Sequence, residues 1–244
     1  MRIFYKTFLG LICLFSTAYA DDINLFRIGI GGLYGSYTSD AGGNDFKNIG
    51  GYVNITGRSF INTTRNLITE GGGDIAFGKN SNQIDSGALY MYEGFFNVGY
   101  NLATQNYPLY LKLEYAYGTL AEEIQDNATA LRTSLHQIGG VLHGFIHTQG
   151  KTTYEYALGY YYVFYGYHYF YPNNQDSGIR SRINDYTYAL KAHIGFTYNF
   201  TERFGVFMNL KARYYDIAKS HRNTTFDYPK AQNLVGMLEL GLQF

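Results

Sequence analysis

Apolar and polar residues alternate with a period of two through most of this chain. The final segment, 234–244, shows the pattern most simply, since its apolar or small residues share one register while Glu239 and Gln243 occupy the other. Successive side chains of a strand point to opposite faces, so the segment predicts a strand with one apolar and one polar face. The same alternation predicts eight strands in all, at 26–30, 88–101, 109–118, 135–147, 153–168, 185–199, 204–215 and 234–244.

Residues 38–87 decide the strand count. A single loop of that length would be exceptional in a compact domain. Segments 49–61 and 67–78 also alternate, and the polar run 62–66 between them suits a short turn. We therefore expect ten strands, the alternative being eight strands with a long first outer loop. The glycines Gly71–Gly73 indicate either sharp curvature of a strand or plain loop.

The charged residues of these strands all fall on the polar register. A lipid-facing Lys or Arg costs about 2–4 kcal/mol at the bilayer midplane, so the pattern is what a transmembrane barrel requires. A soluble β-sandwich would instead bury several tyrosine hydroxyls of 153–168, each needing a partner. We expect the inward charges to pair across strands: Arg27, Glu93, Lys112, Glu114, Glu155, Lys191, Lys211, Arg213 and Glu239. Bulky aromatic residues are expected to fill the lumen beside them: Phe95, Phe145, Tyr161, Tyr165, Tyr167, Phe207 and Tyr215.

The connections between the predicted strands alternate in length. Those at 102–108, 148–152 and 200–203 are short, and those at 119–134, 169–184 and 216–232 are longer. Short periplasmic turns and long outer loops are typical of outer-membrane barrels, so both termini should be periplasmic. Within the first long loop, 121–131 has weak signals for a helical turn.

The N-terminus has the form of a secretory signal peptide. Arg2 and Lys6 precede the apolar run 8–15, and Ala18-Tyr19-Ala20 supplies a small-x-small cleavage site. Cleavage leaves residues 21–244, with no linker-like segment, as a single barrel domain. That chain has no cysteine, and its 17 basic and 19 acidic residues give no basic field for nucleic acid. The full sequence has 27 tyrosines and 18 phenylalanines, which favour strands and membrane interfaces.

The C-terminal strand resembles the closing strand of Gram-negative outer-membrane β-barrels, whose assembly machinery reads a segment ending in Phe. Phe244 ends this chain. The resemblance to small barrels of the OmpA-type or porin-like kind implies an all-β, closed antiparallel transmembrane barrel in the bacterial outer membrane. It also implies that Phe244 acts as an assembly signal, with outer-membrane lipid and lipopolysaccharide as neighbours.

No motif predicts catalysis. No aspartate is followed two residues later by Asp or His, as omptin-like proteases require, and no histidine is followed by Ser at that spacing, as barrel lipases and deacylases require. The dipeptides Asp85-Ser86 and Asp176-Ser177, with His168 or His221, resemble palmitoyltransferase barrels, but Asp-Ser-Gly is ordinary turn chemistry. We expect no enzyme activity, cofactor or metal site.

Three functions remain open at this stage. The first is a barrel with a side-chain-filled lumen and a structural or surface-interaction role through its outer loops. The second is a small porin-like channel for small solutes, and the third an outer-membrane enzyme acting on lipid or peptide, disfavoured by the missing motifs. Basic residues of the last two long loops are candidate contacts for lipopolysaccharide phosphates: Arg180, Arg182, Lys219, Arg222 and Lys230.

Overall fold

A computed structural model of the chain describes most of the residues that follow the N-terminal segment. The described ranges are 23–40, 45–61, 65–82, 86–124, 129–148, 150–171, 179–201, 204–221 and 228–244. The signal peptide, its cleavage site, Asp85, the Asp176-Ser177 pair and Arg222 therefore lie outside the described residues. None of the described segments forms a helix with the length and apolarity needed to cross a membrane.

Twelve strands account for nearly all of the described residues. Ten are long: β1 (Ile23–Ser39), β2 (Phe46–Ile61), β3 (Leu67–Ser81), β4 (Ser86–Asn101), β5 (Leu109–Ile124), β6 (Thr129–His147), β7 (Thr152–Tyr171), β9 (Tyr188–Asn199), β10 (Gly205–Ile217) and β12 (Ala231–Gln243). Two are short: β8 (Ile179–Ile183) and β11 (Ser220–His221).

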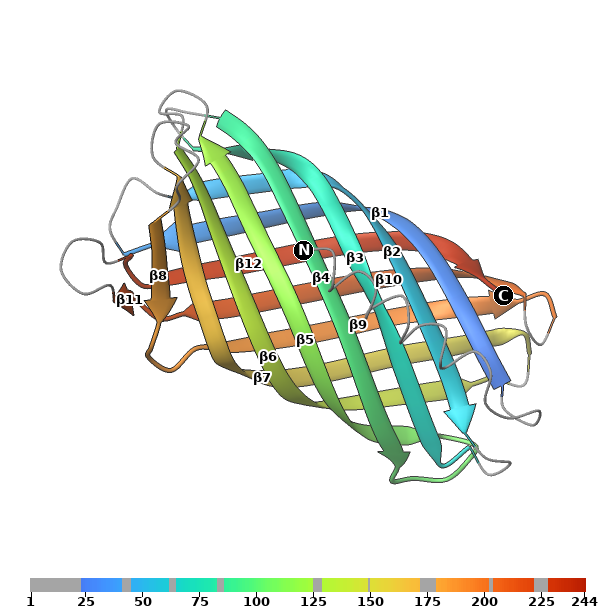
Figure 1. The fold of residues 1–244 in the computed structure, drawn as a ribbon. Helices are drawn as coiled ribbons and strands as arrows, with labels where there is room; N and C mark the ends of the chain where they lie inside the picture. Colours follow the sequence, from blue (N-terminus) through green and yellow to red (C-terminus); the bar gives the residue numbers. More distant parts are fainter. Residues whose placement is uncertain are drawn as a thin grey trace, which may run out of the picture.

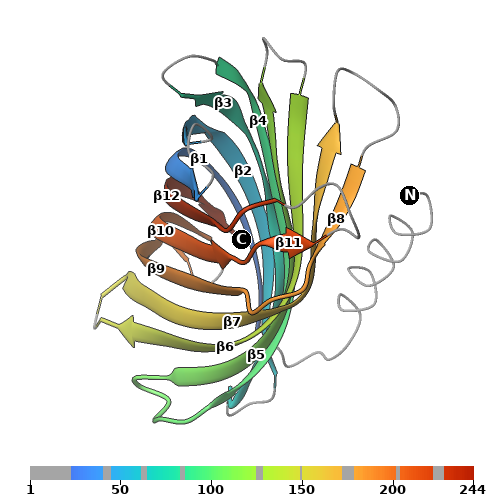
Figure 2. The ribbon, with the colours of Figure 1, turned by 90° about the vertical axis from the view of Figure 1, so that its left-hand side faces the viewer.

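The ten long strands form a closed antiparallel barrel (Figure 1). Each pairs with the next along the chain from β1 to β7; β7 then pairs with β9, β9 with β10, β10 with β12, and β12 with β1. The seam between β1 and β12 runs from the pair Arg27–Gln243 to the pair Ser39–Ala231. Figure 2 shows β1, β12, β10, β9, β7 and β6 following one another around the wall. Ten strands are thus confirmed, and the eight-strand alternative is wrong because β2 and β3 are paired throughout.

The two ends of the barrel differ. We call the end that holds the connections around 62–66, 102–108, 148–151 and 200–204 the turn end, and the opposite one the loop end. The barrel sequence begins and finishes at the turn end, where the backbones of Phe26 and Phe244 exchange two hydrogen bonds. At the loop end, β8 pairs with the last part of β7, and β11 pairs with β8 (Figure 1).

The glycine-rich segment of β3 is strand, not loop. A Cβ atom at Gly72 would lie 2.3 Å from the carbonyl oxygen of Ile55, and one at Gly73 would lie 2.5 Å from that of Glu93. Neighbouring backbones therefore approach too closely here for any side chain. The run of glycines permits this tight wall, consistent with the curvature interpretation.

Strand polarity changes along the barrel axis. Over most of the wall the outward residues are apolar, among them Ile30, Leu113, Leu158 and Leu240, all more than half exposed. Strands β5, β6 and β7 have 16, 19 and 20 residues, whereas about 9–11 residues span a bilayer. The surplus lies partly at the loop end, where the simple alternation is lost: the buried inward residues include apolar ones such as Leu89, Leu131 and Ile183 beside uncharged polar ones such as Asn48 and Asn80, while Arg132 and Arg180 face outward.

A β-bulge reverses the expected direction of two tyrosines. Residues of β6 and β7 pair as Gln137–Val163 and then His136–Tyr165, so Phe164 is an extra residue in β7. Beyond it the alternation shifts by one position. Tyr165 and Tyr167, expected in the lumen, therefore lie on the outside, where their rings contact Arg180. The expected helical turn at 121–131 is also wrong, because Ala121 to Ile124 and Thr129 onward pair as a hairpin.

Candidate functional site

The interior of the barrel is the candidate site, because it gathers most of the buried charge. The structure places all nine predicted lumen residues on the inward face. Seven have 9% or less of their surface exposed, and the side chains of Lys191 and Lys211 are 12% and 16% exposed. Charges this deep are tolerated only when paired and hydrogen-bonded. The pairing pattern therefore determines what the lumen can do.

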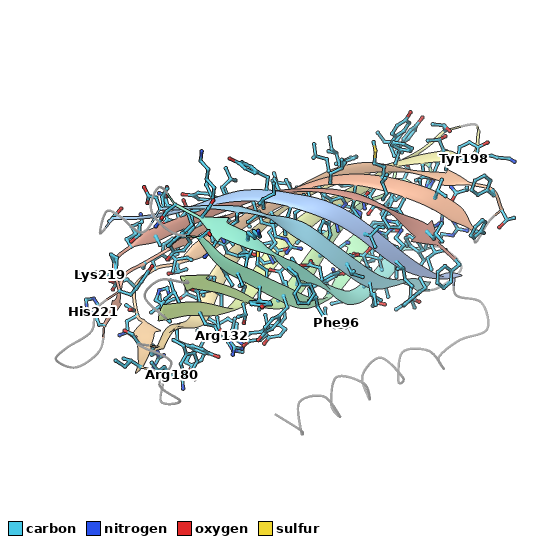
Figure 3. All side chains as sticks on the ribbon, turned by 90° about the horizontal axis from the view of Figure 1, so that it is seen from above. Phe96, Arg132, Arg180, Tyr198, Lys219 and His221 are labelled. Atoms are coloured by element: carbon cyan, nitrogen blue, oxygen red, sulfur yellow. The ribbon has the colours of Figure 1, made fainter. Side chains whose placement is uncertain are left out.

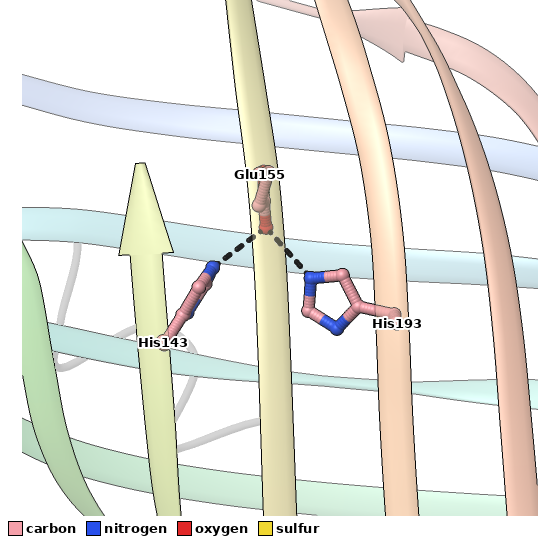
Figure 4. Close-up of side chains that lie close together, drawn as sticks. All are labelled: His143, Glu155 and His193. Atoms are coloured by element: carbon pink, nitrogen blue, oxygen red, sulfur yellow. Dashed lines mark hydrogen bonds and ion pairs between the residues drawn. The ribbon is translucent and has the colours of Figure 1, made fainter. Parts of the chain in front are cut away.

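Glu155 on β7 is the centre of the larger cluster. Arg27 Nη1 donates to its Oε2 at 2.8 Å, and Arg58 Nη2 donates to its Oε1 at 2.6 Å. The Nε2 atoms of His143 and His193 lie 2.9 Å and 3.2 Å from the same Oε1 (Figure 4). Both carboxylate oxygens are thus saturated by donors from β1, β2, β6 and β9. This one carboxylate connects strands from opposite sides of the barrel.

Glu70 on β3 extends this cluster. It forms ion pairs with Arg58 and with Lys112 Nζ, which also contacts His143 Nδ1. The guanidinium of Arg58 lies 4.8 Å from the ring centre of Phe145, and that of Arg27 lies 5.1 Å from Phe207. These cation–π contacts fix the arginine planes against the aromatic lumen wall.

A second cluster lies nearer the loop end. Arg213 pairs with both Asp74 and Glu93, and Lys191 Nζ lies 2.8 Å from Glu93 Oε2. Tyr215 donates a hydrogen bond to the same Glu93 oxygen at 2.9 Å. Separate from it, Lys211 pairs with Glu239, and Glu114 accepts hydrogen bonds from Tyr161 at 2.7 Å and Asn97 at 2.9 Å. Both signs are therefore interleaved along the lumen instead of forming rings of one sign.

The lumen is closed by apolar residues on both sides of these clusters. Towards the turn end, Ile68, Tyr110 and Phe145 pack together with Phe60. Towards the loop end, thirteen buried residues form one apolar cluster, including Leu33, Tyr37 and Leu89, and a second cluster surrounds Tyr161 and Ile217. A cavity of about 140 Å³ remains among the charged residues. At roughly 30 Å³ per molecule it has room for a few waters.

His143, Glu155 and His193 form the one group of metal-ligand side chains found among the described residues. Their ligand atoms lie within 4.8 Å of one another, and two imidazoles with one carboxylate are a set that zinc accepts. The surroundings do not fit a cation, however. Arg27 and Arg58 already occupy the oxygens of Glu155, and Lys112 contacts the other nitrogen of His143. A divalent ion would add two positive charges beside three cationic side chains, so we interpret the group as part of the ion-pair network.

Sequence reasoning missed three members of the network: Arg58, Glu70 and Asp74 are all buried inside the barrel. Each lies on the polar register of β2 or β3, the two strands whose existence the sequence left open. His143 lies on β6, and its partner Glu155 is on β7, the next strand. The sequence does mark these residues, because each lies on the inward register of its strand. Comparing the inward residues of neighbouring strands would have brought them together.

The predicted lipopolysaccharide contacts lie in different kinds of structure. Arg180 and Arg182 belong to β8, not to a loop, and both are exposed. Lys219 is exposed between β10 and β11, and Lys230 Nζ lies 3.0 Å from Asp216 Oδ1. Figure 3 shows Arg180, Lys219 and His221 at one end of the molecule and Tyr198 at the other.

Comparisons with known proteins bear on the fold. No family model matches the sequence, and no curated protein matches it. The solved outer membrane protease OmpT from Escherichia coli is 13% identical with a TM-score of 0.63, covering 93% of this chain and 98% of that chain. The translocator domain of the autotransporter NalP from Neisseria meningitidis is 10% identical with a TM-score of 0.46, covering 100% and 95%.

Of these two, OmpT superposes well enough to support an argument, and an identity this low carries the fold alone. Its closed antiparallel barrel agrees with the strand order described above. The chain therefore has the all-β fold of a Gram-negative outer-membrane β-barrel.

Proposed function

We propose that this protein is an integral outer-membrane barrel that does not conduct in its resting state and acts at the outer surface, in a structural or surface-interaction role. The observation that carries the proposal is the occupied lumen. Paired charges around Glu155 and Glu93 connect opposite walls, and apolar clusters pack on both sides of them. Barrels of about eight strands have interiors that side chains just fill, whereas 16–18 strands leave an aqueous channel.

The orientation belongs to the same proposal. The two longest connections, 172–187 and 218–230, lie at the loop end, whereas every connection at the turn end has seven residues or fewer, and outer-membrane barrels place short turns in the periplasm. Both ends of the mature chain would then be periplasmic. The loop end, with cationic residues on its exterior, would project from the outer leaflet.

Location and orientation are tested by fractionation and protease shaving. Mature protein starting at Asp21 is expected in the outer-membrane fraction, with gel mobility that changes on heating because a closed hydrogen-bonded barrel resists detergent. Protease added to intact cells should cut in the connections at the loop end and spare a tag inserted after Asp22, at the start of the mature chain. A soluble periplasmic species with native β structure, or cleavage of the tag in intact cells, would contradict the proposal.

Conductance separates the closed barrel from a porin. In planar bilayers the unmodified protein is expected to show only small, infrequent openings. Arg213→Ala removes the cation shared by Asp74 and Glu93 and should increase the size and frequency of the openings, because Asp74 loses its ion-pair partner and Glu93 keeps only Lys191. Glu114→Ala, which frees Tyr161, should have a smaller effect in the same direction. A large, steady, ion-selective conductance of the unmodified barrel would favour the porin alternative.

The proposal gives the protein no catalytic role. OmpT is described as a protease, but the aspartates of this chain lack the Asp-x-Asp and Asp-x-His spacing of omptin-like enzymes. The buried acidic residues are held in ion pairs or, for Glu114, in hydrogen bonds inside the lumen. Cleavage of an unstructured polypeptide by purified, refolded barrel would support the enzyme alternative instead.

A further inference from the structure

The outer wall at the loop end carries a lattice of arginine and tyrosine residues. Across β6, β7 and β8, Arg132, Tyr169 and Arg180 are direct neighbours in one row. In the next row towards the turn end, Tyr167 pairs with Arg182. The tyrosines of β7 face outward here because of the bulge at Phe164, whereas Arg132 follows the ordinary outward register of β6. With strands about 4.8 Å apart, Arg132 and Arg180 lie roughly 10 Å from each other on either side of Tyr169.

The guanidinium groups are held by aromatic rings. That of Arg180 lies 4.4 Å from the ring centre of Tyr167 and 5.8 Å from that of Tyr169, and it also contacts the hydroxyl of Tyr165. The guanidinium of Arg182 lies 5.3 Å from the ring of Tyr165. Such contacts hold the planar groups in place, and a guanidinium has five N–H donors, so the one hydrogen bond to a tyrosine hydroxyl leaves others for a ligand.

Arg132 extends this surface towards β4. Its Nη2 donates a hydrogen bond to the Tyr92 hydroxyl at 2.8 Å, and its guanidinium lies 6.0 Å from the Tyr92 ring. The Tyr92 hydroxyl is 3.3 Å from that of Tyr117. We call Tyr92, Arg132, Tyr165, Tyr167, Tyr169, Arg180 and Arg182 the arginine–tyrosine patch.

The three arginines of the patch have no acidic partner among the side chains that the structure describes, which do not include those of 121–130. The neighbouring Asp185 pairs with His221 instead. Directly below it, nearer the turn end on β6 and β7, Ile138, Tyr162 and Phe164 are exposed by 42%, 46% and 48%. The wall therefore presents cationic donors above an apolar surface, an arrangement that matches a lipid with anionic groups above acyl chains.

We propose that the arginine–tyrosine patch binds the phosphate groups of lipopolysaccharide, with the acyl chains lying on the apolar wall below. Guanidinium groups match phosphate oxygens in bidentate geometry, and the tyrosine hydroxyls supply further donors. The assignment to this lipid rests on the proposed orientation, which places the loop end in the outer leaflet. It extends the sequence-based candidates by adding Arg132 and the tyrosines, and by separating Arg180 and Arg182 from Lys230, which is paired with Asp216.

Native mass spectrometry of the detergent-released barrel tests this binding. The probes are diphosphorylated lipid A and the same lipid with both phosphates removed. The unmodified barrel is expected to prefer the phosphorylated form. Arg180→Gln with Arg182→Gln should weaken binding of that form by about tenfold or more, since hydrogen bonds to charged groups contribute about 1.5–3 kcal/mol. Binding of the dephosphorylated lipid should not change.

Lys47 and Lys79 provide a matched control. Both are exposed, outward-facing cations at the same end of β2 and β3. Lys47→Gln with Lys79→Gln removes the same charge and should leave the preference nearly intact. Equal loss in this control, or no preference in the unmodified barrel, would overturn the proposal, as would complete displacement of the lipid by inorganic phosphate. Conductance of the same samples tests the closed-barrel proposal separately. The lipid-binding proposal and the closed-barrel proposal can therefore fail independently.

Discussion

Replacing Glu155 by alanine is expected to lower the free energy of unfolding of the barrel by about 3–5 kcal/mol, the largest effect of any single change in the lumen. The carboxylate is 4% exposed and is the acceptor for Arg27, Arg58, His143 and His193. Its removal leaves two guanidinium groups buried with Glu70 as the main remaining acid. Urea unfolding in detergent, followed by gel mobility and circular dichroism, measures the change.

Two control variants separate this mechanism from a simple loss of volume. Glu239→Ala breaks one ion pair, with the more exposed Lys211, and should cost less. Replacing Arg27, Arg58 and Glu155 together by apolar residues removes both signs, so most of the stability should return, because buried pairs contribute little beyond their own desolvation. An unfolding midpoint for Glu155→Ala equal to that of the unmodified barrel would show that the cluster is not structural.

Replacing Phe244 by aspartate is expected to reduce the yield of assembled barrel strongly while leaving the behaviour of assembled molecules almost unchanged. The Phe244 ring lies 5.3 Å from that of Phe26, and the two backbones exchange hydrogen bonds of 2.6 and 2.9 Å that finish the seam between β1 and β12. If the assembly machinery reads this residue, as the resemblance of the closing strand implies, the yield will fall further than the free-energy cost of an interfacial charge alone would explain.

Phe204→Asp measures the effect of an interfacial charge on the yield without changing the C-terminal residue. Phe204 is an outward aromatic residue at the same end, 43% exposed against 48% for Phe244. Charged residues near the membrane interface cost about 0–1 kcal/mol, so this control should lower the yield only a few-fold. Similar yields for the two variants would mean that Phe244 contributes as an interfacial side chain and not as a signal.

The sequence predicted the barrel well because each strand alternates between residues suited to lipid and residues suited to the polar lumen. All ten predicted strands are present, and their boundaries differ mainly at the loop end, where β5 and β6 continue into the expected loop. There the outward face is no longer in lipid, so the pattern of apolar outside and polar inside that identified the strands is lost. Strands β8 and β11 were missed for a related reason: with five and two residues they are too short to show a period.

The candidate site was predicted as a set of residues but not as a network. Register alone assigns Arg27 and Glu155 to the lumen. It does not show that they meet, because they are 128 positions apart and become neighbours only across the interior of the closed barrel. Arg58, Glu70 and Asp74 were missed together, since the glycines between Glu70 and Asp74 weakened the case for strand β3.

By itself, the sequence determined the class of fold, the order of the long strands and the direction of most side chains, because a strand repeats every two residues whatever surrounds it. The tertiary structure decided what depends on closure and on single irregularities. The stagger of ten strands selects which charges face each other across the lumen. One additional residue at Phe164 turns Tyr165 and Tyr167 from the interior to the surface, creating the arginine–tyrosine patch. No local pattern marks that bulge, since it is defined only by its pairing with β6.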